Sequence, residues 1–263
     1  MLALVKMAGV KFDAHYNATT VDPPELVRFI RQFHPETGII KPKYSMRELI
    51  IKAQFPPTRN MRYCCAELKE QNGKGRIVVT GVRWAGSLNR RKKRGLVNID
   101  GAEARQIADE LGAQHRDTRY GIILNSDNDE SRMTVERCIR KGKMMVNPII
   151  DWEDADVWEF IKAYKIPYCG LYDKGIKRLG CVCCPMSGRE KRWQDLEDFP
   201  QFRNFYVQTF EKMLEVRRAS GKRIHPNWKD GESVLQWWID EPGIHDERQT
   251  DFFDMGEVDE TNE

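Results

Sequence analysis

Five of the seven cysteines in this 263-residue chain lie in two short stretches. The stretch RLGCVCCPMSG contains Cys181, Cys183 and Cys184, and the stretch YCCAE contains Cys64 and Cys65. The C-x-x-C spacing of Cys181 and Cys184, flanked by glycine and proline, favours a tight turn that directs both sulfurs to one point. Two thiols from each stretch make the four ligands that a tetrahedral zinc ion or an iron–sulfur cluster requires.

The other interpretation of these thiols is packing, with all five clustered cysteines buried and inert. Cys138 and Cys169 stand alone in the sequence, and we interpret both as core residues. Cys183 lies inside the C-x-x-C turn, where it is either a sulfur carrier or a buried spare thiol, and we favour burial.

A second stretch, TGVRWAGSLNR, combines guanidinium groups with a hydroxyl. A strand ending at Gly81 and followed by Arg83, Ser87 and Arg90 would place these groups at the carboxyl edge of a sheet, where open α/β sheets bind ligands. Planar guanidinium groups suit phosphate or sulfate. The alternative is a basic surface turn.

The composition is that of a globular protein without a membrane span: 40% hydrophobic, 32% charged and no apolar run of spanning length. The N-terminus lacks the layout of a secretory signal, so we predict a cytoplasmic protein with reduced cysteines. The net charge is +3, with basic runs at 90–95, 189–192 and 217–223. We interpret these runs as solvated surface, with an anionic ligand or nucleic acid as the alternative.

The elements that must position these residues alternate along the chain. Strands are expected at 10–21, 75–84 and 144–152, and helices at 2–7, 22–33, 102–111, 151–164 and 202–214. Asp22 is the expected N-cap of the second helix, with Pro23 at its first position, and Asp151 is the expected cap of the fourth. This alternation predicts an α/β fold with a mainly parallel sheet.

Four stretches, taken in order, resemble the phosphoadenosine phosphosulfate reductase family of the PP-loop adenine nucleotide alpha-hydrolase-like superfamily. They are RYCCAELK, TGVRWAGSLNR, NPIIDWEDADVWEFIKAYKIPY and GLYDKGIKRLGCVCCP. The resemblance implies a Rossmann-like, mainly parallel sheet in an α/β domain over residues 1–200. A helical extension over 201–250 and an acidic tail over 251–263 would follow.

The resemblance also implies a cofactor and a substrate. A four-iron four-sulfur cluster, with zinc as the alternative, would be held by Cys64, Cys65, Cys181 and Cys184. An adenine nucleotide, either ATP or a sulfonucleotide, would be bound with its phosphate or sulfate end at Gly81, Arg83, Ser87 and Arg90. Thr20 and Asp22 would lie near the nucleoside.

Three departures from the family pattern bear on activity. The S-G-G-K-D-S loop that cradles the nucleotide phosphates is absent, so we expect the first strand and this loop to be missing. Gly86 stands where the G-x-R-x-x-E-S signature has glutamate. No cysteine follows Cys184, whereas the reductases carry a catalytic cysteine near the C-terminus, so the nucleophile of reductase chemistry has no counterpart.

The sequence therefore leaves three functions open, with the catalytic residues unassigned. The first, which we favour, is a sulfur-transfer enzyme in which ATP activates an acceptor and a persulfide supplies sulfur. Its partners would be a sulfur donor or a thioredoxin-like protein, with nucleic acid as one acceptor. The second is a non-catalytic nucleic-acid-binding or assembly protein with a structural metal site. The third is a sulfonucleotide reductase whose thiol comes from another chain.

Overall fold

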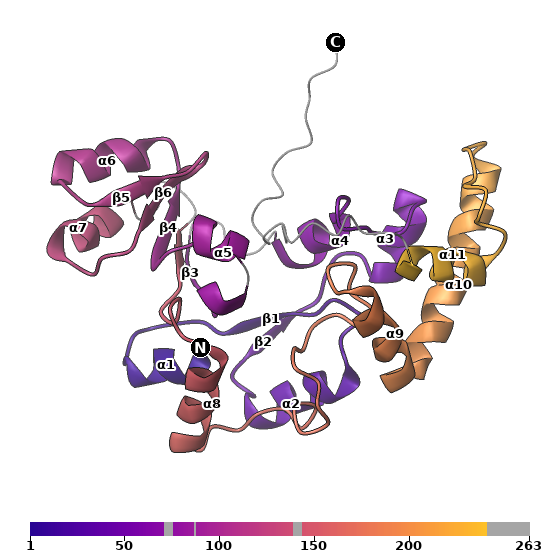
Figure 1. Cartoon of the computed structure of the whole chain (residues 1–263), viewed down its shortest axis with the longest axis horizontal. Coiled ribbons are helices and arrows are strands. Elements are labelled where there is room, and N and C mark those ends of the chain that lie inside the picture. Colours follow the sequence, from indigo (N-terminus) through magenta and orange to yellow (C-terminus); the bar gives the residue numbers. More distant parts are fainter. Residues whose placement is uncertain (71–75, 87, 139–143, 241–263) are drawn as a thin grey trace, which may run out of the picture. The chain divides into compact units, whose positions relative to one another are not determined.

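The computed structural model describes residues 1–70, 76–86, 88–138 and 144–240 (Figure 1). Contacts between residues group the chain into two compact units. The first unit contains the described residues 1–12 and 76–166, and the second contains 13–70 and 167–240. The second unit is thus assembled from two distant stretches of sequence, and each of these stretches carries one group of clustered cysteines.

The first unit contains a five-stranded mixed sheet of order β3-β7-β4-β6-β5. Its strands are β3 (Ile77–Val79), β4 (Val97–Asp100), β5 (His115–Asp117), β6 (Gly121–Leu124) and β7 (Met144–Val146). The β3 and β7 strands pair in parallel, whereas β4–β6, β4–β7 and β5–β6 are antiparallel. The β5–β6 pair is a hairpin, and so short a connection permits only the antiparallel arrangement.

The helices of the first unit are α1 (Leu2–Met7), the 3-10 turn η2 (Trp84–Gly86), α5 (Leu88–Lys93), α6 (Glu103–Leu111), α7 (Asp129–Cys138) and α8 (Asp154–Ala163). Of these, α6 and α7 form the core of the unit with the sheet. The core joins Ile107 of α6 and Cys138 of α7 to Ile99, Ile122 and Met144 of the sheet. Apolar faces of two helices are thereby removed from water against one sheet.

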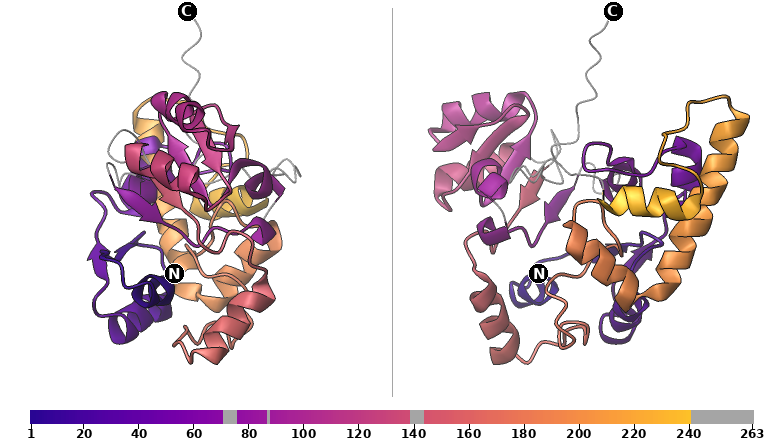
Figure 2. Two further views of the ribbon diagram at one scale, coloured as in Figure 1. Left: turned by 90° about the vertical axis from the view of Figure 1, so that its left-hand side faces the viewer. Right: turned by 45° about the vertical axis from the view of Figure 1, so that its right-hand side comes forward.

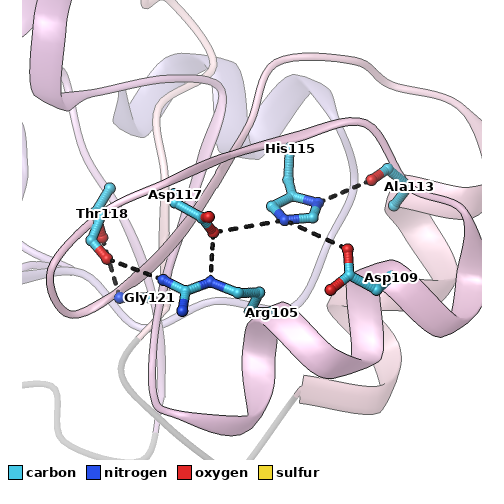
Figure 3. Close-up of polar contacts among 7 residues, drawn as sticks. All are labelled: Arg105, Asp109, Ala113, His115, Asp117, Thr118 and Gly121. Carbon is cyan, nitrogen blue, oxygen red and sulfur yellow. Dashed lines mark hydrogen bonds and ion pairs between the residues drawn. The ribbon is translucent and has the colours of Figure 1, made fainter.

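Polar contacts fasten the edge strand β5 to α6 (Figure 3). Arg105 of α6 donates to the Asp117 carboxylate, and His115 Nδ1 lies 3.0 Å from the Ala113 carbonyl oxygen. His115 Nε2 lies 3.6 Å from Asp117 and 3.8 Å from Asp109. Because an edge strand is paired on one side only, these contacts add a second attachment for it.

The second unit is mainly helical. Its two short strands, β1 (His15–Asn17) and β2 (Gly38–Ile40), pair in parallel. Its helices are α2 (Pro24–Phe33), α3 (Met46–Ala53), α4 (Tyr63–Cys65) with the π-helical turn η1 (Ala66–Glu70), α9 (Arg189–Asp198), α10 (Pro200–Ala219) and α11 (Gly231–Asp240). The long helix α10 packs against both α3 and α11 (Figure 2).

The core of the second unit is aromatic where α10 meets α11. Tyr206 and Phe210 of α10 contact Trp238 of α11, with ring centroids 4.9 Å and 5.3 Å from the indole. All three side chains are almost completely buried. Large rings packed in this way contribute several kilocalories of burial energy, so α10 and α11 are firmly joined.

The α/β class and the helical C-terminal region are confirmed, and the expected helices at 2–7, 22–33 and 202–214 correspond to α1, α2 and part of α10. The two-stranded sheet is parallel, and the five-stranded sheet is mixed because the hairpin and β4 introduce antiparallel pairs. The predicted division at residue 200 stays a prediction, and its tail at 251–263 lies outside the described residues.

Two predicted helix caps are wrong. The N-cap position of α2 is Pro23, and the Asp22 carboxylate instead accepts the Thr19 N–H at 2.6 Å. The N-cap of α8 is Glu153, not Asp151, and Asp156 completes a reciprocal capping box with it. None of the described helices is long and apolar enough to span a bilayer.

Candidate functional site

Four cysteine side chains from distant parts of the sequence line one cavity in the second unit. Cys64 and Cys65 come from α4, and Cys181 and Cys184 come from the loop before α9. The remaining lining residues are Met46, Leu68, Lys69, Val182, Pro185, Tyr206 and Trp238. The four cysteines that the sequence singled out are therefore brought together by the fold.

These thiols do not have the spacing of a single-ion site. Among the residues that the structure describes, no group of three or more His, Cys, Asp or Glu side chains is arranged to hold a metal ion. Cys64 is buried, and the other three are half-buried. The four thiols line one cavity.

Cys64 and Cys65 differ in their affinity for a proton. The pKa of Cys65 is lowered to about 5, first by a hydrogen bond from the Cys64 thiol and then by the Arg62 and Lys69 cations. The same hydrogen bond, together with burial, raises the pKa of Cys64. Cys65 is therefore the ionised member of the pair at neutral pH, and the thiolate is the form that binds metals.

Lys69 supplies a positive charge to the same cavity. Burial lowers the pKa of its ammonium group, but the sulfurs of Cys181 and Cys184 raise it by more, so the net pKa is raised. Lys69 follows Cys65 by four residues, which is the spacing of neighbours on one helical face. This spacing in CCAELK is the signal by which the sequence could have identified Lys69.

Backbone and side-chain contacts hold the loop that contains Cys181. Its Sγ lies 3.4 Å from the Thr19 hydroxyl oxygen, and the next residue, Val182, donates its N–H to the Val21 carbonyl at 2.8 Å. The stretch that follows β1 therefore supports the second group of cysteines.

The cysteines outside the proposed ligand set are core residues, as expected. Cys183 is completely buried, and Cys138 and Cys169 are 2% and 3% exposed. Burial raises the pKa of Cys183 to about 12. A thiol that is both buried and protonated is poorly suited to carry sulfur between partners.

Thr20 and Asp22 are predicted to lie near a nucleoside. In the structure, their side chains accept hydrogen bonds from backbone N–H groups of the second unit. Thr20 has a left-handed backbone (φ 65°), and its hydroxyl accepts the Met46 N–H at the start of α3. Asp22 accepts the Thr19 N–H, and after burial it is the next cause of the raised pKa of Tyr16. Both residues shape the turn after β1, and contact with a ligand is not needed to explain them.

Gly81 and Arg83 lie in the first unit, just after β3. Arg83 donates from Nη1 to the Trp152 carbonyl at 3.2 Å and pairs through Nη2 with Asp154 at the start of α8. Its side chain is 20% exposed. Arg90 belongs to α5, with its side chain outside the described part of the structure, and Ser87 lies outside the described residues altogether.

The basic run at 217–223 has structural contacts of its own. Arg217 donates to the carbonyls of Gln54 and Arg223, and Arg218 donates to the carbonyl of Lys229. These guanidinium groups fasten the loop between α10 and α11. The run therefore needs no nucleic-acid partner to explain it.

A family model described as the phosphoadenosine phosphosulfate reductase domain matches residues 1–187. The chain belongs to this family. Over 109 residues it is 31% identical to an uncharacterized protein of Methanocaldococcus jannaschii, and the match covers 36% of this chain and 25% of that protein. Over 91 residues it is 34% identical to adenosine 5'-phosphosulfate reductase of Salinibacter ruber, covering 30% of this chain and 36% of the reductase. The chain thus spans no more than about a third of the length of these relatives.

A solved structure of phosphoadenylyl-sulfate reductase from Candida auris, in complex with phosphate, is 18% identical to the chain. The match covers 68% of this chain and 73% of that structure, with a TM-score of 0.38.

The match to the phosphoadenosine phosphosulfate reductase family ends before α9 begins. Yet α10 and α11 contribute Tyr206 and Trp238 to the cavity of the four cysteines. Motifs of the reductase family could not predict these two residues, because they lie beyond the matched segment.

Proposed function

We propose that this member of the phosphoadenosine phosphosulfate reductase family holds a four-iron four-sulfur cluster and acts in adenine-nucleotide-dependent sulfur-transfer or sulfonucleotide chemistry. The ligands would be Cys64, Cys65, Cys181 and Cys184. The observation that carries the proposal is the convergence of these four thiols on one cavity.

The residues around the cavity fit such a group. Cubane clusters are held by four cysteine thiolates, and the cavity provides four thiols, one of which has a lowered pKa. The Lys69 and Arg62 cations offset the negative charge that four thiolates would bring together. When bound, the cluster would supply a redox or electrostatic centre. Zinc accepts the same four ligands and is the alternative occupant.

Arg83, in the first unit, is a candidate contact for an anionic ligand. Asp154 and the Trp152 carbonyl hold its guanidinium in one orientation, and a guanidinium group carries five N–H donors, so donors remain for a phosphate or sulfate. Membership of the family supports an adenine nucleotide as that ligand.

The reaction class follows from the absence of a nucleophile. No cysteine follows Cys184 in the sequence, and Cys183 is fully buried. None of the cysteines up to Cys184 is thus suited to take sulfite from a sulfonucleotide. We propose that a sulfur donor supplies the transferred sulfur or that a second protein supplies a thiol.

The cluster is tested by anaerobic purification followed by quantification of iron, zinc and sulfide. We expect about four irons per chain with matching sulfide, and a broad visible absorption band. Cys64→Ser and Cys184→Ser should each lose most of the iron. Cys169→Ser is the matched control, because Cys169 is buried in the same unit but does not line the cavity. One zinc and no iron per chain would contradict the proposal.

The nucleotide is tested by equilibrium dialysis of the full chain against ATP and adenosine 5'-phosphosulfate. Arg83→Gln should weaken binding at least tenfold, since a hydrogen bond to a charged group contributes about 1.5–3 kcal/mol. Arg132→Gln is the control, because Arg132 is an exposed arginine of the same unit that pairs with Asp127. Equal affinities for the two variants would exclude Arg83 from the site.

A further inference from the structure

The peptide that joins Val182 to Cys183 is held at both of its polar groups by side chains of the C-terminal helices. Its carbonyl oxygen accepts the Tyr206 hydroxyl of α10 at 2.9 Å, and its N–H donates to the Asp195 carboxylate of α9 at 2.9 Å. Both hydrogen bonds are buried. This peptide lies midway between Cys181 and Cys184, so its orientation sets the direction of both thiols.

The backbone on either side of this peptide leaves it little freedom. The Val182 N–H is bonded to the Val21 carbonyl, and Cys183 has a left-handed backbone (φ 58°) that a non-glycine residue rarely adopts. Such a conformation persists only where its surroundings impose it. The two side-chain hydrogen bonds are the contacts that impose it here.

Asp195 is itself firmly held. It is 6% exposed, and it forms an ion pair with Lys191 one turn earlier on α9. The neighbouring Arg192, also buried, stacks 4.2 Å from the Trp238 ring and donates to the Trp238 carbonyl, which ties α9 to α11. Removing a carboxylate from water is costly unless it is paired, and Asp195 is paired with Lys191 and with the Cys183 N–H.

We propose that Asp195 and Tyr206 are positioning residues that clamp the Val182–Cys183 peptide, so that Cys181 and Cys184 face the cavity before any metal arrives. The purpose that we assign to the clamp depends on the proposed cluster, whereas its two hydrogen bonds are present without a metal. It gives the helices that follow the family segment a function in the cysteine site.

The first test uses the full metal-free chain and measures hydrogen exchange at the Cys183 amide. Tyr206→Phe and Asp195→Ala should each speed this exchange about fivefold, the factor for a hydrogen bond of about 1 kcal/mol. The double variant should exchange faster than either single variant, because both bonds oppose the same opening of the peptide. Exchange at the wild-type rate in both single variants would contradict the clamp.

Thr209→Val is the matched control. Thr209 lies on the same helix as Tyr206, is completely buried, and donates its hydroxyl to the Phe205 carbonyl. Its loss should lower the stability of the chain against urea without changing exchange at Cys183. If Tyr206→Phe and Thr209→Val give the same exchange rate there, the clamp is wrong.

The second test measures how fast iron is lost to a chelator from the loaded chain. Tyr206→Phe and Asp195→Ala should lose iron about fivefold faster than wild type, and Thr209→Val at the wild-type rate. Loss at the wild-type rate from both clamp variants would overturn the positioning role and leave the cluster proposal intact. If wild type takes up no iron, the cluster proposal fails, and the exchange experiment alone still decides the clamp.

Discussion

Cys183 is a buried cysteine whose backbone, rather than its thiol, contributes to the cysteine site. Its thiol is completely buried and its raised pKa keeps it protonated, while its backbone N–H is the group that Asp195 uses. We predict that Cys183→Ala keeps the iron content of wild type and lowers the free energy of unfolding by about 1–2 kcal/mol, through the small cavity that remains. Iron analysis and urea unfolding measure the two effects.

Sulfur transfer is the measurement that would contradict this prediction. If Cys183→Ala bound iron normally but lost sulfur transfer, while Cys169→Ala kept it, Cys183 would be a sulfur carrier after all. The comparison is informative because both thiols are buried in the second unit.

At the scale of single residues, the sequence predicts the cysteines that line the cavity better than the residues that hold them in place. Residue type and spacing were sufficient to select the four cysteines that line the cavity. Asp195 and Tyr206 act on a peptide 12 and 24 residues away, and no local spacing signals contacts over such separations. Thr20 and Asp22, predicted to lie near the nucleoside, contact Met46 and Thr19 in the structure, and their role toward a nucleotide stays a prediction.

Among the elements, α3 has the clearest local start signal. Ser45 accepts the Glu48 N–H, and the Glu48 carboxylate accepts the Ser45 N–H, which makes a complete capping box. We predict that Ser45→Ala lowers the free energy of unfolding by about 1 kcal/mol at pH 7, as measured by urea unfolding. Since α3 packs against α10, the loss should appear in the global transition. A change in local helicity alone would contradict this.

The Ser45–Glu48 capping box makes the stability of the folded protein depend on pH, and the direction of this dependence follows from the pKa of Glu48. The hydrogen bonds from Ser45 lower the pKa of Glu48 below its ordinary value of 4.5. A carboxyl group with a lower pKa in the folded state stabilises the protein above the unfolded pKa, and this stabilisation is lost as the pH falls through the folded value. The stability difference between wild type and Glu48→Gln should therefore be constant near neutral pH and shrink as the pH falls below the ordinary value of 4.5 and through the lowered pKa of the folded state. A difference that grew in acid would have the wrong sign.

Helices were more predictable than strands in this chain, for a physical reason. The helix at 202–214 follows from aromatic residues repeating on one face, and it is found within α10. By contrast, β5 consists of His115, Arg116 and Asp117, whose polar side chains give no strand signal. The β5 strand forms only because it pairs with β6 in the folded protein. Since the sequence did not predict β5, it could not predict that the sheet is mixed.

At the scale of the whole molecule, all four proposed ligands belong to one unit, which is assembled from two stretches of sequence. A group that binds only the folded form of this unit stabilises it by mass action. We predict that loading with iron and sulfide slows hydrogen exchange in α4, α9 and α10, while β6 and α7 of the first unit exchange as in the metal-free chain. Mass spectrometry of peptides from both units, compared with and without the metal, measures this. Equal slowing in β6 and α7 would show that the two units unfold as one, and no slowing in α9 and α10 would show that the C-terminal helices are not coupled to the cysteine site.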